Sequence, residues 1–124
     1  MSFQDAISDG FSKYVQFSGR SSRSAYWYWT LFALIVYIVA YAVGAAIDSL
    51  ILYYIAALAL FLPSLAVGVR RLHDTGRSGW WYLIGLVPLI GGIVLLVFFI
   101  QPSDGPNEYG AGPDNAAQAP APAF

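Results

Sequence analysis

The sequence predicts an all-α integral membrane protein with three transmembrane helices, a short interfacial helix at the N-terminus and a disordered C-terminal tail. Hydrophobic residues make up 58% of the 124-residue chain and charged residues 10%, whereas soluble domains have roughly 45–50% and about 25%. Three runs, 26–47, 49–69 and 80–100, hold no charged residue. A helix needs about 20 apolar residues to cross a hydrocarbon core of about 30 Å, so each run is long enough to span a membrane.

Residues 1–25 form the first of three segments along the chain. Phe3, Ile7 and Phe11 recur there at helical spacing, which predicts a short amphipathic helix on the membrane surface. A loosely ordered leader is the alternative. The three-helix membrane domain follows over 26–100. The last segment, 101–124, is rich in proline, glycine and alanine, which predicts a flexible tail.

The first two runs are separated by Asp48 alone, which predicts a tight helical hairpin. Gly44 is suited to end the first helix because glycine tolerates the left-handed conformation. Asp48 or Ser49 is suited to cap the second helix by accepting its free backbone N–H groups. One continuous helix would exceed about 60 Å, roughly twice the hydrocarbon thickness. We therefore expect a turn.

The charges predict the orientation in the membrane. Three spans place residues 1–25 and 70–79 on one side, and this side holds all six basic residues. The other side holds four acidic residues, Asp48, Asp104, Glu108 and Asp114. Basic residues in short loops stay in the cytoplasm. The N-terminus and the 70–79 loop are therefore predicted to be cytoplasmic, and the C-terminus extracytoplasmic.

The stretch RRLHDTGRSGWW at 70–81 concentrates the polar chemistry of the chain between two apolar runs. The planar guanidinium group of arginine binds phosphate or carboxylate through two parallel hydrogen bonds. Clusters of basic residues also attract anionic lipid headgroups. The hypothesis is an anionic-headgroup or partner site; the alternative is that these charges only mark the topology. The candidate site residues are Arg20, Arg23, Arg70, Arg71, His73, Asp74 and Arg77.

Aromatic residues gather where the first and third runs begin. Tryptophan and tyrosine are enriched at membrane–water interfaces. The predicted interfacial anchors are Tyr26, Trp27, Trp29, Trp80 and Trp81. Ser78 stands just before the second cluster, as expected of a residue that caps a helix N-terminus.

Catalytic and metal chemistry find little support in the sequence. His73 and Asp74 are adjacent, but no spacing supplies a nucleophile and an orienting partner. One histidine and no cysteine are too few for a zinc site of three or four ligands. The GRSG stretch at 76–79 lacks the spacing of a phosphate-binding loop. We expect no catalytic residue, no metal, no cofactor and no nucleic-acid partner.

Four motifs together resemble the bacterial domain of unknown function 805 family. They are FSGRSSRSAYWYW at 17–29, RRLHDTGRSGWW at 70–81, Pro88 with Ile90 and Gly91, and a group in the tail formed by Gly105, Asn107, Tyr109 and Gly110. The resemblance implies a small bacterial inner (plasma) membrane protein with few spans. No catalytic role can be carried over from the family, because its activity is unassigned.

The predicted function is that of a non-enzymatic membrane protein that binds lipid, a small anionic ligand, another membrane protein or a second copy of itself. One alternative is a subunit of an oligomeric transporter or channel. Coupled carriers keep an ionisable residue inside a span, and 26–47, 50–69 and 80–100 contain none. A weaker alternative is an enzyme that acts on lipid headgroups through His73, Asp74 and the arginines.

Overall fold

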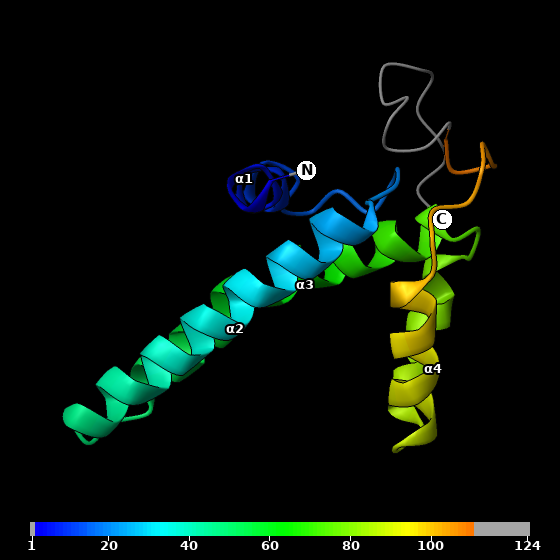
Figure 1. Cartoon of the computed structure of the whole chain (residues 1–124). Helices are drawn as coiled ribbons and strands as arrows, with labels where there is room; N and C mark the ends of the chain where they lie inside the picture. The colour runs from blue at the N-terminus through cyan, green and yellow to red at the C-terminus, as the bar shows by residue number, and fades with distance from the viewer. Residues whose placement is uncertain (1, 111–124) are drawn as a thin grey trace.

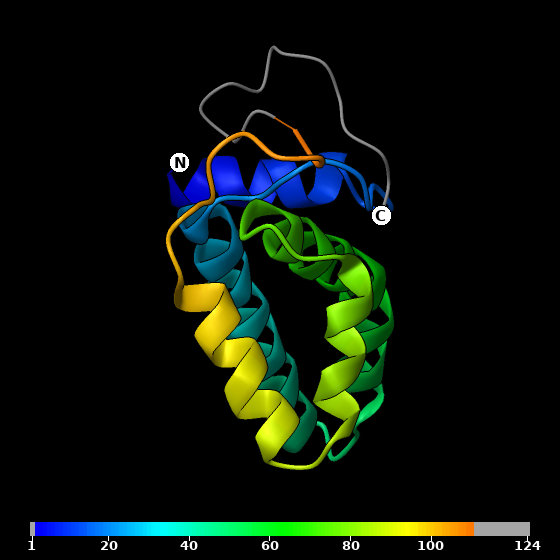
Figure 2. The same ribbon diagram turned by 90° about the vertical axis from the view of Figure 1, so that its right-hand side faces the viewer.

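The computed structural model describes residues 2–110 and is all-helical over that range, as predicted. Two helical hairpins diverge from a common end, and the N-terminal helix lies over the first of them near that end (Figure 1, Figure 2). We call this common end, formed by 13–23, 70–79 and 101–110, the polar end. The elements in chain order are α1 (Phe3–Ser12), α2 (Arg23–Ala46), α3 (Ile51–Asp74), the 3₁₀ helix η1 (Gly79–Leu86) and α4 (Ile90–Ile100).

Helix α1 covers the predicted amphipathic segment. Ser2 caps it, because its Oγ accepts a hydrogen bond from the Asp5 N–H at 3.1 Å. Phe11 packs edge-on against Trp29 of α2, with ring centroids 5.1 Å apart. A methyl group added at Gly10 would overlap the Trp29 ring. Gly10 weakens the helix by about 1 kcal/mol relative to alanine, but here it permits the close approach of α1 to α2.

Helices α2 and α3 form the predicted hairpin. Each has 24 residues and is therefore about 36 Å long, enough to cross a bilayer. The turn differs in detail from the prediction. Asp48, at φ 55°, adopts the left-handed conformation, while Gly44 stays inside α2 and accepts the Ser49 N–H at 2.8 Å. A side chain at Gly44 would collide with the Ser49 carbonyl.

A proline inside α3 explains one long-range contact. Pro63 has no N–H, so the carbonyl four residues earlier, that of Ala59, loses its helical donor. The Tyr14 hydroxyl donates a hydrogen bond to that Ala59 carbonyl. An unsatisfied carbonyl in hydrocarbon costs several kcal/mol. The linker after α1 thus supplies the hydrogen-bond donor that this carbonyl lacks within α3.

The prediction of one continuous helix over 80–100 is wrong. The run divides into η1 and α4, which pack against each other as a second hairpin. Its tip is a tight turn in which the Ile90 N–H donates to the Pro88 carbonyl at 2.7 Å and Leu89 has φ 65°. Gly91 lets the arms touch, since a side chain there would overlap the Ile84 carbonyl. Helix α4 has 11 residues, about 16 Å, which is too short to span a bilayer.

The prediction that residues 101–110 lie on the opposite side of the membrane from the 70–79 loop is consequently also wrong. The second hairpin returns the chain to the polar end, where the Asp104 N–H donates to the Asp74 carbonyl at 2.7 Å. Residues 101–110 are hydrogen-bonded there, whereas the rest of the predicted flexible tail, 111–124, lies outside the described residues. Among residues 2–110, Asp48 is the one charged residue at the opposite end of the first hairpin.

Candidate functional site

The last turn of α3 is the centre of the polar end. Four of its side chains, those of Arg70, Arg71, His73 and Asp74, have no exposed surface. Charged residues are almost never fully buried unless they are paired. Because successive residues of a helix point in different directions, these four contact different segments of the chain.

Asp74 accepts hydrogen bonds from three side chains. Its Oδ1 accepts from Arg20 Nε at 3.1 Å, and its Oδ2 accepts from Arg71 Nη1 at 2.6 Å and from the Ser103 hydroxyl. The Arg20 side chain is 2% exposed. Two guanidinium groups and one carboxylate thus share a site with almost no access to water, and loss of the carboxylate would leave both guanidinium groups without a counter-charge.

Arg20 uses its remaining donors on the backbone. Its Nη1 donates to the carbonyls of Gly105 and Gly110, both at 2.9 Å. Its Nη2 donates to the carbonyls of Asp74 at 3.1 Å and Asp104 at 2.6 Å. The guanidinium therefore holds the 104–110 loop on the end of α3.

Arg71 binds the end of α4. Its Nε donates to the Phe99 carbonyl at 3.2 Å and its Nη2 donates to the Gln101 carbonyl. The last four carbonyls of a helix have no partner within the helix, and positive charge is favoured at this end. Arg71 satisfies both requirements while it also pairs with Asp74.

Helix α2 supplies two further donors to the end of α4. Trp27 Nε1 donates to the Phe99 carbonyl at 3.1 Å, and Arg23 Nη1 donates to the Ile100 carbonyl at 3.3 Å. We call Arg23, Trp27 and Arg71 the α4 collar. Together they fix the C-terminal end of α4 at the polar end.

Arg70 faces the linker between α1 and α2 instead. Its Nε donates to Ser21 Oγ at 3.1 Å, and its Nη1 donates to the carbonyls of Lys13 at 3.2 Å and Gln16 at 2.6 Å. The Ser21 N–H donates in return to the Arg70 carbonyl at 3.0 Å. Asp9 of α1 lies 4.0 Å from Arg70 Nη2. Arg70 thus attaches the N-terminal segment to α3.

His73 is enclosed by the loop after α4. Its Nδ1 lies 2.9 Å from the Gly19 carbonyl, which can only accept, so Nδ1 carries the proton. Its ring stacks on Tyr109 with centroids 4.1 Å apart and planes 2° apart. Its Nε2 is buried without a hydrogen-bond partner among the described residues. The imidazole and the Asp74 carboxylate are both buried. No group of three metal-binding side chains occurs within residues 2–110.

The remaining two arginines lie at the edge of the cluster. Arg23 is exposed. The Arg77 guanidinium carbon lies 3.9 Å from the centroid of the Phe98 ring, and its Nη1 donates to Gln101 Oε1 at 2.9 Å. Phe98 in turn packs edge-on against Trp81 at 5.7 Å. Beside them is an open cavity of about 320 Å³, lined by Ser78, Trp80, Trp81 and Ile84.

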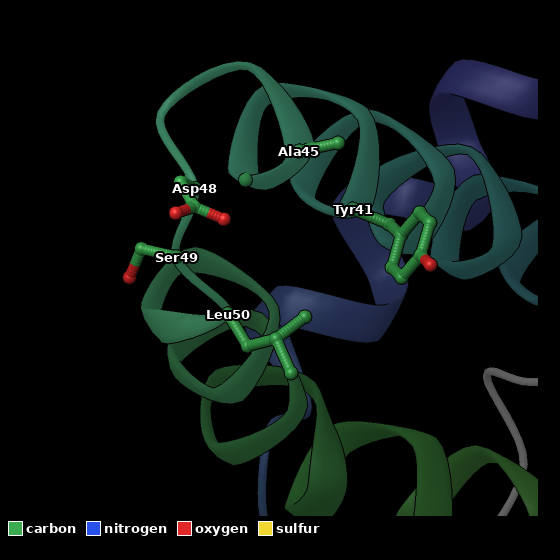
Figure 3. A pocket seen from close by; sticks show the side chains of 6 residues that line it. Tyr41, Ala45, Asp48, Ser49 and Leu50 are labelled. Atoms are coloured by element: carbon green, nitrogen blue, oxygen red, sulfur yellow. The ribbon is translucent and has the colours of Figure 1, made fainter.

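A second open cavity, of about 190 Å³, lies at the turn of the first hairpin, far from these charges along α2 and α3 (Figure 3). Tyr41, Asp48 and Leu50 are among its lining residues. It contains none of the predicted site residues.

The structure brings together four of the seven predicted site residues: Arg20, Arg71, His73 and Asp74. Arg70 binds Ser21 and the linker after α1 instead, while Arg23 and Arg77 lie at the edge. The observed partners are carbonyls and the Asp74 carboxylate within the chain. Binding of an external anion by these residues remains a prediction.

The predicted anchors divide between the surface and the interior. Trp80 is 68% exposed and Trp81 47%. Tyr26 packs on Phe99 at 4.4 Å. Trp29 corrects the prediction: it is 2% exposed and its Nε1 donates to Ser64 Oγ at 3.0 Å, so it is a core residue between α2 and α3.

Sequence reasoning missed the residues that close the cluster from the tail. The Asn107 amide donates to the His73 carbonyl at 3.1 Å, and Tyr109 covers the imidazole. The Ser103 hydroxyl donates to Asp74, and Gln101 Oε1 accepts from Arg77. The tail motif around Asn107 and Tyr109 was the available signal, because polar and aromatic residues at fixed places in a loop indicate contacts.

Comparison with known proteins places this architecture in a family. The family model for the protein of unknown function DUF805 matches residues 14–111. Inner membrane protein YhaI of Escherichia coli K12 is 46% identical over 105 residues, which cover 81% of this chain and 87% of that protein. Inner membrane protein YhaH of the same organism is 40% identical over 110 residues, covering 82% and 88%. No solved structure matches the chain. The chain is therefore a member of DUF805, a membrane-protein family of unknown function.

Proposed function

We propose that this protein is a non-enzymatic inner-membrane protein that binds anionic phospholipid at the edge of its polar end. Helices α2 and α3 cross the bilayer, and the polar end faces the cytoplasm. The orientation is supported by the six basic residues, all of which belong to the polar end. Basic residues of short loops stay in the cytoplasm. The inner-membrane location is supported by the names of the E. coli relatives.

The observation that carries the lipid proposal is the cavity beside Arg77. Its lining is mostly apolar, and two of its residues are exposed tryptophans. Arg77 precedes the lining residue Ser78 in the chain and stacks on Phe98, which packs against the lining residue Trp81. Tryptophan favours headgroup depth, and a guanidinium pairs with phosphate. A phospholipid fits this combination, with its phosphate near Arg77 and Arg23 and an acyl chain against Trp80 and Trp81.

The buried cluster has a different role in this proposal. Arg20, Arg70 and Arg71 hold the segments of the polar end together, and their guanidinium groups are enclosed. The headgroup contacts therefore fall to Arg23 and Arg77. An enzymatic role is not favoured, because the acid–base groups His73 and Asp74 are enclosed as well.

Native mass spectrometry of the purified protein tests the proposal. Phosphatidylglycerol and zwitterionic phosphatidylethanolamine are titrated onto wild type, the Arg23→Gln/Arg77→Gln variant and a Lys13→Gln control. Each lost contact is worth about 1 kcal/mol, so the double variant loses roughly 30-fold in phosphatidylglycerol affinity, and the control retains it. Equal retention by all three proteins, or equal binding of both lipids by wild type, contradicts the proposal. Loss of a dimer rather than of lipid adducts also contradicts it, and assigns the surface to self-association.

A further inference from the structure

The tips of the two hairpins have opposite chemistry. The tip of α2–α3 carries Asp48 and has the exposed Tyr41 and Tyr54 nearby, at 60% and 59% exposure. A charge flanked by tyrosines is typical of a membrane–water interface. The tip of η1–α4 has no charged or aromatic residue over 83–97, and Leu86 and Leu89 are each 80% exposed. Burying one such side chain away from water contributes about 1.5–3 kcal/mol, so this tip belongs in hydrocarbon.

The lengths of the two hairpins differ by a factor of about two. The eight residues of η1 rise about 16 Å at roughly 2 Å per residue, and the eleven of α4 also rise about 16 Å. The hydrocarbon core is about 30 Å thick. A hairpin of this height, starting at the interface, ends near the middle of the bilayer.

The backbone of the tip is suited to that depth. Non-helical backbone within a membrane requires internal hydrogen bonds. At the tip, Val87 donates to the Ile84 carbonyl at 3.0 Å, Ile90 to Pro88 at 2.7 Å and Gly91 to Val87 at 3.0 Å. Pro88 has no N–H that would need a partner. The turn therefore satisfies most of its donors without water.

Both ends of the hairpin are attached to the polar end. Ser78 caps η1, since its Oγ accepts the Trp80 N–H at 3.2 Å. The α4 collar binds the carbonyls of Phe99, Ile100 and Gln101. From this geometry we infer that η1–α4 is a re-entrant hairpin, which inserts among the acyl chains of one leaflet and returns to the side it came from. The inference rests on the proposed membrane placement of α2 and α3, but not on lipid binding at Arg77.

The cysteine-free chain allows a direct test by single-site labelling in phosphatidylglycerol–phosphatidylethanolamine vesicles. Four variants are made: Leu89→Cys at the hairpin tip, Pro106→Cys in the returning loop, Ser12→Cys on α1 and Asp48→Cys at the far turn. Sidedness is measured with a membrane-impermeant maleimide added outside, and again after the vesicles are opened. Depth is measured by attaching an environment-sensitive fluorophore and quenching it with lipids spin-labelled at defined acyl positions.

A re-entrant hairpin predicts that Pro106→Cys reacts from the same side as Ser12→Cys and from the side opposite to Asp48→Cys. It also predicts that the label at 89 is quenched most by the deepest spin label. Reaction of positions 106 and 48 from the same side shows a full crossing of 80–100 and overturns the inference. A label at 89 quenched best near the headgroups shows a hairpin lying on the surface and overturns it too. If positions 12 and 48 react from one side, the proposed crossing of α2 and α3 fails instead.

Discussion

The two hairpins are built from similarly apolar sequence but are held together in different ways. In α2–α3 the arms contact each other along the core, where Trp29 donates to Ser64 and packs with Leu60 and Val67. In η1–α4 the arms touch at Gly91 and through the Trp81–Phe98 ring contact, and the polar end fixes the base through Arg71. The first hairpin is thus held mainly by contacts between its own arms, whereas the second also depends on hydrogen bonds from Arg71, Trp27 and Arg23 at its base.

The largest expected effect on the free energy of unfolding follows from removing Arg71, which holds the base of the second hairpin. Arg71→Leu leaves the buried Asp74 with one guanidinium fewer and the end of α4 without its main donor. Breaking a buried ion pair costs about 3–5 kcal/mol, so a large drop in the free energy of unfolding in detergent is expected, with release of 101–110 to limited proteolysis. Arg71→Lys, which keeps the charge without the fork, should be intermediate. Stability equal to wild type in both variants would show that Arg71 does not hold the hairpin.

The next largest effect on the free energy of unfolding is expected at the hydrogen bond from Tyr14 to the Ala59 carbonyl of α3. Tyr14→Phe leaves the Ala59 carbonyl unsatisfied, which costs about 1–3 kcal/mol. Pro63→Ala restores an N–H to α3, so Tyr14→Phe should cost much less in that background. The measurement is a double-mutant cycle of unfolding free energies. An identical cost of Tyr14→Phe in both backgrounds would dismiss the coupling.

Two adjacent glycines of α4 are expected to respond in opposite ways to substitution by alanine. A methyl group at Gly91 overlaps the Ile84 carbonyl, whereas none of the described atoms outside the helix lies within 4 Å of one at Gly92. Gly91→Ala should therefore destabilise the hairpin by about 1–3 kcal/mol. Gly92→Ala should stabilise it by up to about 1 kcal/mol through helix propensity. Thermal unfolding of the two variants checks the difference, and equal shifts would place the contact between the arms elsewhere.

The first hairpin could be predicted from sequence because its determinants are local. Length and hydropathy fix the two spans, and Asp48 marks the turn. The same criteria failed for 80–100, since neither registers the close contact at Gly91 or the donors that Arg71 and Trp27 offer from other helices. A run of 21 apolar residues fits a span and a folded hairpin equally well.

The sequence predicted where the arginines concentrate but not what each of them contacts, for a related reason. The sequence shows that arginines concentrate at 70–77, but charge counting does not distinguish a guanidinium facing lipid from one enclosed by carbonyls. Arg71 is enclosed and Arg77 lies at the edge. Trp29 was assigned to the interface by its neighbours in sequence, whereas its burial depends on Gly10 of a helix nineteen positions earlier.

The central claim is that the second hairpin returns the chain to the polar end. Pulsed electron paramagnetic resonance measures the distance between two spin labels within one molecule. The labels are attached in the double variants Ser18→Cys/Pro106→Cys and Asp48→Cys/Pro106→Cys. The account predicts a distance below about 20 Å for the first pair and above about 30 Å for the second, because helices of 24 residues separate the two ends. The reverse order, with position 106 near 48 and far from 18, would contradict it.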